Sequence, residues 1–430
     1  MKRYYFKKLN GISLKNLCKR KPICFDDILP VVKNILAEVK NRGDEALLEF
    51  TAKFDNINLS SFEITEKEIE ESTKRIPQDI QKAFQKAAYN IKKFHKLQLS
   101  KPKKIETMDG VYCFTEMRPI EKVGLYIPGG TAPLASTVLM LAIPAKLAGC
   151  KEIVLVTPPT KEGKVADIIL FSAKLCGITK IFKIGGAQAI AALAFGTESI
   201  PKVDKIFGPG NKYVTLAKML VSIDPEGSAI DMPAGPTEIL IIADEKARAD
   251  FVASDLLSQL EHDTDSIAIL VTTSNKKADE ILVELKKQMK ELPRGEIARK
   301  ALGNGFIMIV DSIEEAIAFS NQYAPEHLVL NATNPRKYIS SIKNAGSVFL
   351  GPYSPVSAGD YAVGTNHSLP TYGYARVFGG ISVSSFQKII TFQEITKQGA
   401  KNLGPIVSIM ALQEGLEGHK KAMQLRYETL

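Results

Sequence analysis

Short runs of β-branched and aliphatic residues alternate with apolar helical stretches over most of this chain. From residue 123 the runs are VGLYI, KEIVLV, KIFKI and KIF, and from residue 238 they are EILIIA, SIAILV, FIMIV, HLVL and SVFL. The segments between them carry apolar residues at helical spacing. Strands that alternate with helices in this way predict mostly parallel sheets covered by helices. The sequence therefore predicts an α/β fold with two Rossmann-like parallel-sheet units.

Glycine- and proline-rich stretches indicate how the two units are joined. With 430 residues, the chain exceeds what one hydrophobic core usually covers. One such stretch, 231–236, falls between the two series of strands, and another, 127–130, lies at the front of the first series, so one unit is predicted to be inserted in the other. The expected segments are an N-terminal arm (1–26), a larger α/β domain (27–129 and 239–381), an inserted α/β domain (130–238) and a C-terminal tail (382–430). Both terminal segments are expected to be helical, and the tail is too small to fold alone.

The charge balance argues against nucleic acid as a partner. The net charge of +9 comes from 56 basic and 47 acidic residues, and beyond the first twenty or so positions the two signs are interspersed. The basic N-terminal residues, from Lys2 to Lys21, are expected to form a solvated helix or a packing arm. No recognised nucleic-acid-binding module is present.

Cysteine usage and hydropathy indicate the compartment. The five cysteines form no metal-type Cys-x-x-Cys pair, and the N-terminus has no apolar signal core, so reduced thiols in the cytoplasm are expected. Cys113 and Cys150 have no histidine nearby in the sequence and are expected to be inert thiols. The longest apolar stretch, 133–150, is interrupted by Pro144 and Lys146 and is too short to span a membrane.

Four residues form a candidate metal site. Gln259 and His262 are three apart in a segment predicted to be helical, so their side chains leave the same face. Together with Asp360 and His419 they supply nitrogen and oxygen donors without thiolate, which suits an open catalytic zinc site. In the alternative interpretation each residue serves locally, Asp360 as a turn cap and His262 as a structural histidine.

Glu326 and His327 form an adjacent pair of groups that transfer protons. They follow Pro325, which fixes the preceding turn, and neighbouring side chains there diverge. The two groups could therefore act on different atoms of one substrate in acid/base chemistry. The alternative is a solvent-facing loop acid followed by the first residue of a strand, and the sequence pattern alone leaves both interpretations open.

Two glycine-rich turns follow strands of the first series and begin helices. They are GGAQ at 185–188 and GPGN at 208–211, and backbone N–H groups at such turns can hold phosphate. Neither matches the G-x-G-x-x-G dinucleotide fingerprint, so glycines that only shape tight turns explain them about equally well. A ligand is favoured because Gln188 and Asn211 add amide groups, and Tyr126 adds a third polar group near the same sheet edge.

Eight stretches of this sequence together resemble the histidinol dehydrogenase family. They occur in the family's order and cover nearly everything beyond the first hundred residues: VGLYIPGGTAPLASTVLMLAIPAKLAGC (123–150), IGGAQAIAALAFGT (184–197), FGPGN (207–211), DMPAGPTE (231–238), LLSQLEHD (256–263), YAPEHL (323–328), SAGDYAVGTNHSLPT (357–371) and EGLEGHKKA (414–422). The resemblance implies an NAD-linked, zinc-dependent enzyme of histidine biosynthesis with one zinc per site. Its implied reaction is the four-electron oxidation of L-histidinol to L-histidine through bound L-histidinaldehyde.

The resemblance also implies roles for individual residues. The implied zinc ligands, which also contact the substrate, are Gln259, His262, Asp360 and His419. Glu326 and His327 match the catalytic acid/base pair, and His327 also contacts the substrate. The implied NAD contacts are Tyr126, Gln188 and Asn211, which makes 130–238 the NAD-binding domain. Further substrate contacts are implied at Thr237 and Glu414.

The resemblance finally implies a homodimer. The tail 382–430 would reach into the neighbouring subunit, so that Glu414 and His419 complete the other chain's site. L-histidinol and NAD are then the small-molecule partners, and neither nucleic acid nor a membrane is expected as a partner. A zinc hydrolase remains an alternative, since it would use the same metal with Glu326 as the base for water. It would leave both glycine-rich turns unexplained.

Overall fold

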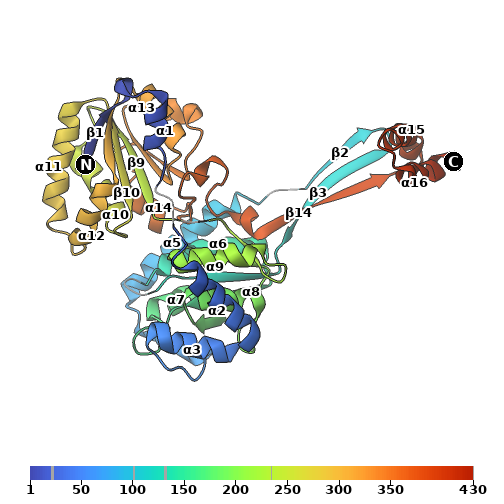
Figure 1. Cartoon of the computed structure of the whole chain (residues 1–430), viewed down its shortest axis with the longest axis horizontal. Helices are drawn as coiled ribbons and strands as arrows, with labels where there is room; N and C mark the ends of the chain where they lie inside the picture. The colour runs from blue at the N-terminus through green and yellow to red at the C-terminus, as the bar shows by residue number, and fades with distance from the viewer. Residues whose placement is uncertain (21–23, 100–101, 130–132, 234, 430) are drawn as a thin grey trace.

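Two parallel sheets form the body of the protein (Figure 1) in this computed structural model. It describes residues 1–20, 24–99, 102–129, 133–233 and 235–429. The six-stranded sheet has the order β1 (Lys2–Tyr5), β11 (Phe306–Ile309), β10 (Ile267–Thr272), β9 (Glu238–Ala243), β12 (His327–Asn331) and β13 (Ser347–Leu350). The five-stranded sheet has the order β6 (Lys180–Lys183), β5 (Glu152–Thr157), β4 (Lys122–Tyr126), β7 (Lys205–Phe207) and β8 (Ala229–Ile230). The α/β prediction with two parallel-sheet units is confirmed.

Helices cover both faces of each parallel sheet, which is why strands such as β9 are buried along their whole length. The six-stranded sheet is accompanied by α1 (Gly11–Leu17), α10 (Ala249–Leu260), α11 (Asn275–Met289), α12 (Gly295–Ala301), α13 (Ile313–Tyr323) and α14 (Val356–Tyr361). The five-stranded sheet is accompanied by α2 (Leu29–Arg42), α3 (Asp44–Asp55), α4 (Glu66–Arg75), α5 (Gln78–Lys96), α6 (Ala135–Ala148), α7 (Asp167–Leu175), α8 (Gly186–Phe195) and α9 (Lys212–Ile223). Short 3₁₀ helices are η1 (Phe6–Lys8), η2 (Leu302–Asn304), η3 (Pro335–Ser341), η4 (Tyr374–Arg376) and η5 (Val383–Phe386).

Most of the segment 27–129 lies with the five-stranded sheet, and residues 103–108 and 111–119 lie in a separate antiparallel sheet, which differs from the predicted domain division. Helices α2 and α3 share a core with α8 and α9, and β4 is the central strand of that sheet. The prediction had joined 27–129 to 239–381. Helical periodicity shows which face of α2 is buried, but it does not show which sheet covers that face. The predicted boundary at Gly130 lies outside the described residues.

An antiparallel arm projects from the body and carries the C-terminus at its far end (Figure 1). It consists of β14 (Gln387–Ile395), β3 (Val111–Pro119) and β2 (Lys103–Met108), and then of α15 (Lys397–Gln413) packed on α16 (Glu417–Glu428). The tail 382–430 was expected to be helical. The structure adds β14, whose pairing partner β3 lies far away in the sequence.

The N-terminal segment contains the predicted helix and, in addition, a strand. Its strand β1 extends the six-stranded sheet by pairing in parallel with β11. Helix α1 follows, with the side chain of Asn10 accepting a hydrogen bond from the Ser13 N–H at its N-terminus. None of the helices in the described ranges is both long and apolar enough to cross a membrane.

Candidate active site

Five of the predicted site residues form a continuous series of contacts at the amino ends of β9 and β12. Thr237 Oγ1 lies 2.7 Å from Gln259 Oε1 and 2.7 Å from Glu326 Oε2. Glu326 Oε2 lies 3.5 Å from His327 Nδ1, and His327 Nε2 lies 3.7 Å from Asp360 Oδ1. The structure thus brings an amide, a hydroxyl, an imidazole and two carboxylates into one cluster.

Neighbouring parallel strands explain why these residues meet. Thr237 directly precedes β9 and Glu326 directly precedes β12, and these two strands are adjacent, with His327 paired to Ile239. Gln259 comes from the last turn of α10. The cluster therefore lies at the amino edge of the six-stranded sheet. This is opposite to the carboxyl edge, where open parallel sheets usually bind ligands.

The His327 ring is held in one tautomer. Its Nδ1 lies 3.1 Å from the backbone oxygen of Glu238, and a carbonyl oxygen only accepts hydrogen bonds. Nδ1 therefore carries the proton of the neutral ring and Nε2 is unprotonated. The ring is 3% exposed, and Nε2 has no hydrogen-bond partner among the described residues. A nitrogen that can act as a base thus faces the side of the site where Asp360 lies.

Two carboxylates set the protonation of His327. Burial lowers the pKa of the ring, but Glu326 and Asp360 outweigh this effect and raise the pKa to about 10. Glu326 is itself buried, which is incompatible with the alternative of a solvent-facing loop acid. A cation bound to Asp360 would offset part of the attraction and bring the pKa of His327 back towards neutrality.

The single hydrogen of the Thr237 hydroxyl determines how Gln259 is oriented. Both neighbours of the hydroxyl are acceptor oxygens as placed, yet it can donate to only one of them. Both contacts are satisfied when Gln259 turns its Nε2 to donate to Thr237, and Thr237 donates to Glu326. This orientation leaves the amide oxygen of Gln259 free to bind a cation.

The predicted metal donors are divided between the body and the arm. Gln259 and Asp360 lie in the cluster, and His262 follows just beyond α10 with an exposed side chain. Glu414 and His419 lie on the α15–α16 hairpin at the far end of the arm, so one chain does not bring them to the cluster (Figure 1). Accordingly, the described part of a single chain gathers no three His, Cys, Asp or Glu residues around a metal position.

The predicted NAD contacts lie at the carboxyl edge of the five-stranded sheet. Tyr126 ends β4, and its hydroxyl accepts a hydrogen bond of 3.2 Å from the Gly186 N–H at the start of α8. Burial raises the pKa of Tyr126 to about 12. Gln188 is buried in the first turn of α8. Asn211 precedes α9 and accepts hydrogen bonds from the N–H groups of the next turn. All three residues thus lie beside the amino ends of helices.

A buried ion pair that was not predicted holds the GPGN turn. Asp231 Oδ2 accepts a 2.9 Å hydrogen bond from the Gly208 N–H, and Lys218 Nζ donates to the Gly208 carbonyl at 2.8 Å. Lys218 and Asp231 also pair with each other at 2.5 Å, and both side chains are buried. Both peptide groups that flank Gly208 are therefore fixed, which places Asn211 at the start of α9.

Comparison with known proteins identifies the family. The sequence model of the histidinol dehydrogenase family matches residues 18–427. A histidinol dehydrogenase of Vibrio vulnificus (strain YJ016) is 53% identical over 404 residues, which are 94% of this chain and 93% of that protein. One of Bacteroides fragilis (strain YCH46) is 53% identical over 414 residues, 96% of both. This chain belongs to the histidinol dehydrogenase family.

Structural similarity agrees with this assignment. The crystal structure of histidinol dehydrogenase from Elizabethkingia anophelis superposes with a TM-score of 0.97 at 49% identity, covering 100% of this chain and 98% of that one. The family resemblance predicted from the sequence is confirmed. Membership of the histidinol dehydrogenase family makes the chain an oxidoreductase of histidine biosynthesis.

Three residues near the cluster were missed by sequence reasoning. Arg20, expected in a solvated helix or packing arm, is buried against Glu238. His367 Nδ1 lies 2.7 Å from the Asp360 backbone oxygen, and His367 Nε2 lies 3.1 Å from Thr137 Oγ1 on α6. Two of these residues carried a signal in the sequence. Glu238 is a carboxylate at the start of the apolar run EILIIA, and His367 lies inside a stretch shared with the histidinol dehydrogenase family.

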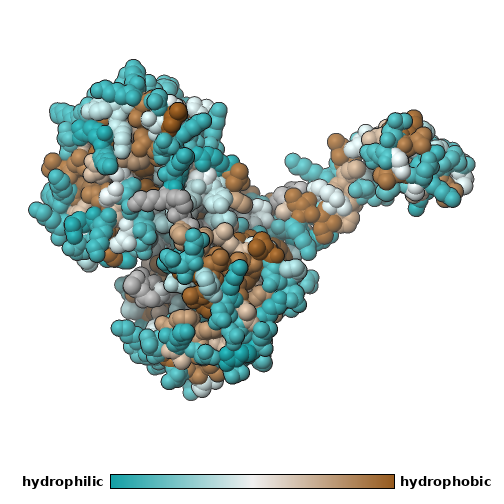
Figure 2. Space-filling model, in the orientation of Figure 1, coloured by the Kyte–Doolittle hydropathy of each residue, from teal (hydrophilic) through white to brown (hydrophobic). Residues whose placement is uncertain are grey.

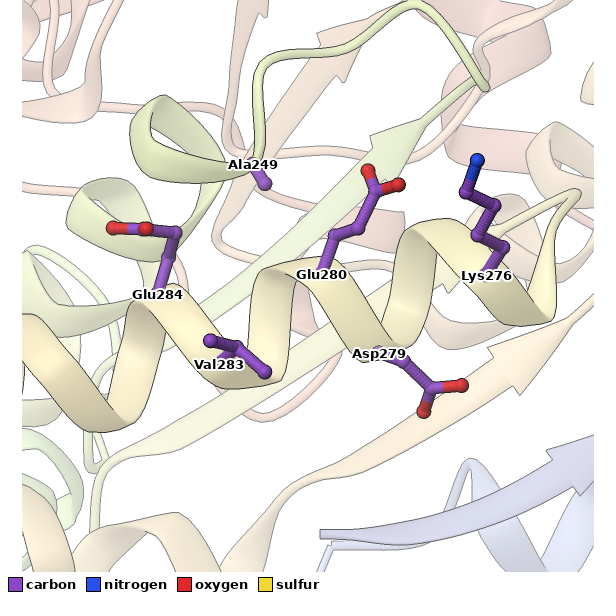
Figure 3. Close-up of a pocket in the computed structure, with 6 residues that line it drawn as sticks. All are labelled: Ala249, Lys276, Asp279, Glu280, Val283 and Glu284. Atoms are coloured by element: carbon purple, nitrogen blue, oxygen red, sulfur yellow. The ribbon is translucent and has the colours of Figure 1, made fainter.

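An open surface depression of about 770 Å³ lies elsewhere, along α11 (Figure 3). It is lined by Ala249, Lys276, Asp279, Glu280, Val283 and Glu284. Figure 3 shows the side chain of Asp279 pointing away from those of Glu280 and Lys276. None of the five residues of the cluster at the amino ends of β9 and β12 lines this depression, so it is separate from the candidate active site.

Burial makes Cys150 an unreactive thiol. It raises the pKa of Cys150 to about 11, so the thiolate is scarce at neutral pH. The Sγ atom lies 3.8 Å from the backbone oxygen of Phe386, at the base of the arm. Cys150 is therefore better suited to the expected role of an inert thiol than to that of a covalent nucleophile.

Proposed function

We propose that this chain oxidises L-histidinol to L-histidine in two NAD-linked steps at one zinc-containing site. The series of contacts from Gln259 through Thr237, Glu326 and His327 to Asp360 carries this proposal. It joins two of the proposed metal donors, Gln259 and Asp360, to a buried base and a buried carboxylate through contacts of 2.7 to 3.7 Å. The family assignment supplies the substrate, since the relatives are named for histidinol.

The proposed zinc ligands are Gln259, His262 and Asp360 of one chain and His419 of a second chain. Their nitrogen and oxygen donors fit an open catalytic zinc site. The Nε2 of His327 has no hydrogen-bond partner among the described residues, and an amide nitrogen of Gln259 turned towards Thr237 would leave its amide oxygen free for the metal. When bound, zinc would hold the imidazole and amine of histidinol in register and stabilise negative charge on its oxygen.

His327 is the proposed base of the first oxidation. A cation bound to Asp360 would lower the raised pKa of His327 and leave Nε2 unprotonated. Nε2 then takes the proton of the substrate hydroxyl while the carbinol carbon transfers hydride to NAD, which leaves an aldehyde and one NADH. The Glu238 carbonyl accepts a hydrogen bond from the Nδ1–H group throughout. That hydrogen bond fixes the ring orientation, and the neighbouring carboxylate of Glu326 stabilises the imidazolium that forms.

Glu326 is the proposed base for water in the second oxidation. Its carboxylate accepts hydrogen bonds from the Thr237 hydroxyl at 2.7 Å and the Glu238 N–H at 2.9 Å. From this position it takes a proton from a water molecule as that water attacks the aldehyde carbon. His327 returns its first proton to the aldehyde oxygen as the hydrate forms, and it then takes a proton of the hydrate as a second hydride passes to a second NAD. In total, histidinol, two NAD and one water give histidine, two NADH and three protons.

We propose that NAD binds at the carboxyl edge of the five-stranded sheet, within the segment 130–238. The amino ends of α8 and α9 and the buried Tyr126–Gly186 hydrogen bond lie there. Oriented N–H groups at helix amino ends bind the pyrophosphate of dinucleotides. Gln188 and Asn211 then supply amides for the remaining polar groups of NAD.

We further propose that the enzyme is a cytoplasmic homodimer in which the tail 382–430 completes the neighbouring site. The arm extends away from the body (Figure 1), and Figure 2 shows apolar side chains on its surface. The exposed apolar residues of the α15–α16 hairpin include Ile406, Ile409, Met410, Leu412, Leu416 and Leu425. A second copy would cover this surface and would receive Glu414 and His419. The five free cysteines suit a reducing compartment.

Separate substitutions of the two proposed bases test the mechanism. With L-histidinol and NAD, the purified parent is expected to form NADH and L-histidine. His327→Asn is expected to lose both oxidations by a factor on the order of 10² to 10⁴. Glu326→Gln is expected to retain the first oxidation and to lose the second, so that NADH formation falls to about one per histidinol. Equal losses of both steps in Glu326→Gln would contradict its assigned role.

A further inference from the structure

A buried ion pair between the N-terminal segment and β9 lies directly behind the proposed active site. Arg20 Nη2 is 2.5 Å from Glu238 Oε2, and Arg20 Nε is 3.2 Å and 3.3 Å from the two carboxylate oxygens. The side chains are 5% and 0% exposed. The remaining guanidinium hydrogens go to backbone oxygens, from Nη1 to Tyr323 at 2.6 Å and Cys18 at 3.0 Å. The guanidinium also stacks 3.6 Å from the centre of the Tyr323 ring.

The backbone of Glu238 holds both proposed bases. Its N–H donates to Glu326 Oε2 at 2.9 Å, and its carbonyl accepts from His327 Nδ1 at 3.1 Å. The backbone of Glu238 thus positions the Glu326 carboxylate, which is proposed to activate water, and selects the tautomer of His327. Any rotation of this backbone displaces both groups together.

The ion pair also fixes two residues with left-handed backbone conformations. Ala324 has φ 56° and Tyr372 has φ 56°, a region that is unfavourable for residues with a side chain. Arg20 Nη2 donates to the Ala324 carbonyl at 3.2 Å, and the Tyr372 N–H donates to Glu238 Oε1. Ala324 leads into Glu326 through Pro325. Strained backbone persists only where its surroundings hold it in place, and here the Arg20–Glu238 pair does so.

We propose that Arg20 is a positioning residue of the active site. It neutralises the buried Glu238 carboxylate and holds Glu238 and the 323–324 backbone in the arrangement that aligns Glu326 with His327. This inference rests on the proposed roles of those two bases. It also assigns the N-terminal segment a part in the reaction through Arg20 itself, although that residue does not contact the substrate.

The planar guanidinium is specific to this role. Arg20 binds both carboxylate oxygens and three backbone carbonyls at once, which uses its fixed fork of donors. A lysine at this position has the same charge but three donors on one atom. Charge alone therefore does not restore the arrangement.

The test compares Arg20→Ala and Arg20→Lys with the control Arg3→Met. Arg3 lies in the same N-terminal segment and also binds a carboxylate, Asp279 at 2.5 Å, but on the outer face of α11. Arg20→Ala is expected to lower kcat on the order of 10²-fold with little change in the KM for NAD, because misplaced bases slow the chemistry. The kcat of Arg20→Lys is expected to remain well below that of the parent. The kcat of Arg3→Met is expected to equal that of the parent.

Rescue by added guanidinium separates positioning from mere stability. Added at concentrations far below those that unfold the parent, guanidinium is expected to raise kcat of Arg20→Ala several-fold and to leave Arg3→Met unchanged. Parental kcat in folded Arg20→Ala or Arg20→Lys would overturn the inference. If Arg20→Ala does not fold, Arg20→Lys alone decides it. The proposed function is tested separately, since it fails if the parent itself forms no NADH from histidinol.

Discussion

At the scale of single residues, the Thr237 hydroxyl connects a proposed metal ligand to a proposed base. It contacts Gln259 and Glu326 at the same distance of 2.7 Å, and one hydrogen serves both contacts only if the amide nitrogen faces it. A group that orients a metal ligand is a large determinant of metal affinity. Thr237 thus has a second expected role beside the substrate contact that the family resemblance implied.

Replacing Thr237 by valine keeps its shape and removes the hydroxyl. Thr237→Val is expected to weaken zinc binding by about 10- to 100-fold and to lower kcat, because Gln259 and Glu326 lose their common partner. Thr237→Ser restores the hydroxyl and serves as the control. Zinc retained during dialysis against a chelator, together with kcat, measures both effects. Equal zinc retention by the valine and serine variants would contradict this role.

Asp255 on α10 gives a pH dependence to stability. Burial raises its pKa to about 7, against about 4 in an unfolded chain. Between these values the unfolded chain releases a proton that the folded protein keeps. The free energy of unfolding therefore falls as pH rises from about 4 to about 7, by at most about 4 kcal/mol.

Asp255→Asn removes this titration and keeps an oxygen for the Val356 N–H that Asp255 contacts. The variant is expected to be more stable than the parent at about pH 8, by one to a few kcal/mol, and to lose this advantage at about pH 4. Urea unfolding at both pH values measures it. A difference between the two proteins that does not change with pH would show that Asp255 does not titrate in this range.

The sequence predicts residue chemistry better than residue surroundings. Glu326 and His327 could be named as candidates because adjacent carboxyl and imidazole groups can both transfer protons, although the pattern left a local role for them equally open. Arg20 could not, because a basic residue in a basic segment is usually solvated, and only the fold shows that Glu238 is buried opposite it. Contacts between residues more than 200 positions apart leave no local pattern.

At the scale of elements, the strand-to-helix turns of the five-stranded sheet depend on close backbone contact. Gly208 has φ 120°, and a Cβ atom there would lie 2.1 Å from the Tyr126 carbonyl oxygen. Any side chain at this position would push the GPGN turn away from β4. The turn, and with it Asn211, would then leave the position in which NAD is proposed to bind.

Gly208→Ala is expected to raise the KM for NAD at least about tenfold and to destabilise the fold by about 1–3 kcal/mol, because the backbone conformation is strained and the space is filled. Gly303→Ala is the matched control, since a Cβ there has no described atom within 4 Å. NAD titrations and thermal unfolding of both variants provide the comparison. Parental KM and stability in Gly208→Ala would show that the turn tolerates a side chain.

The parallel strands were predictable as elements and the arm strands were not. Strands such as β9 and β5 are buried on both faces and appear as unbroken apolar runs. Strands β2 and β14 are mostly exposed, and β14 pairs with β3 across more than 250 residues. Their mixed polarity is also compatible with helix or loop, so a helical tail was the expectation.

At the scale of the whole molecule, the two functional edges belong to different sheets. The proposed NAD edge is the carboxyl edge of the five-stranded sheet, and the proposed catalytic cluster lies at the amino edge of the six-stranded sheet. His367 connects the two units, since it contacts both Thr137 on α6 and the backbone of Asp360. The helices of 27–129 could pack on either sheet as far as the sequence shows, and only the assembled core decides between them. The observed domain division therefore differs from the predicted one.

The projecting arm leads to a prediction about pairs of inactive variants. His262→Ala and His419→Ala are each expected to be inactive if zinc needs both histidines. In a dimer that exchanges arms, a mixed dimer carries both substitutions in one site and neither in the other. Unfolding and refolding the two variants together is therefore expected to restore about a quarter of parental activity. No restored activity in refolded dimers would contradict the exchange, and refolded parent serves as the control.

The central claim is that one zinc-dependent site carries out both oxidations of histidinol. The most direct measurement counts NADH formed per L-histidinol consumed, before zinc removal, after chelation and after zinc is added back. About two NADH per histidinol, lost on chelation and restored by zinc, is the predicted result. One NADH per histidinol, or full turnover by metal-free enzyme, would contradict the claim.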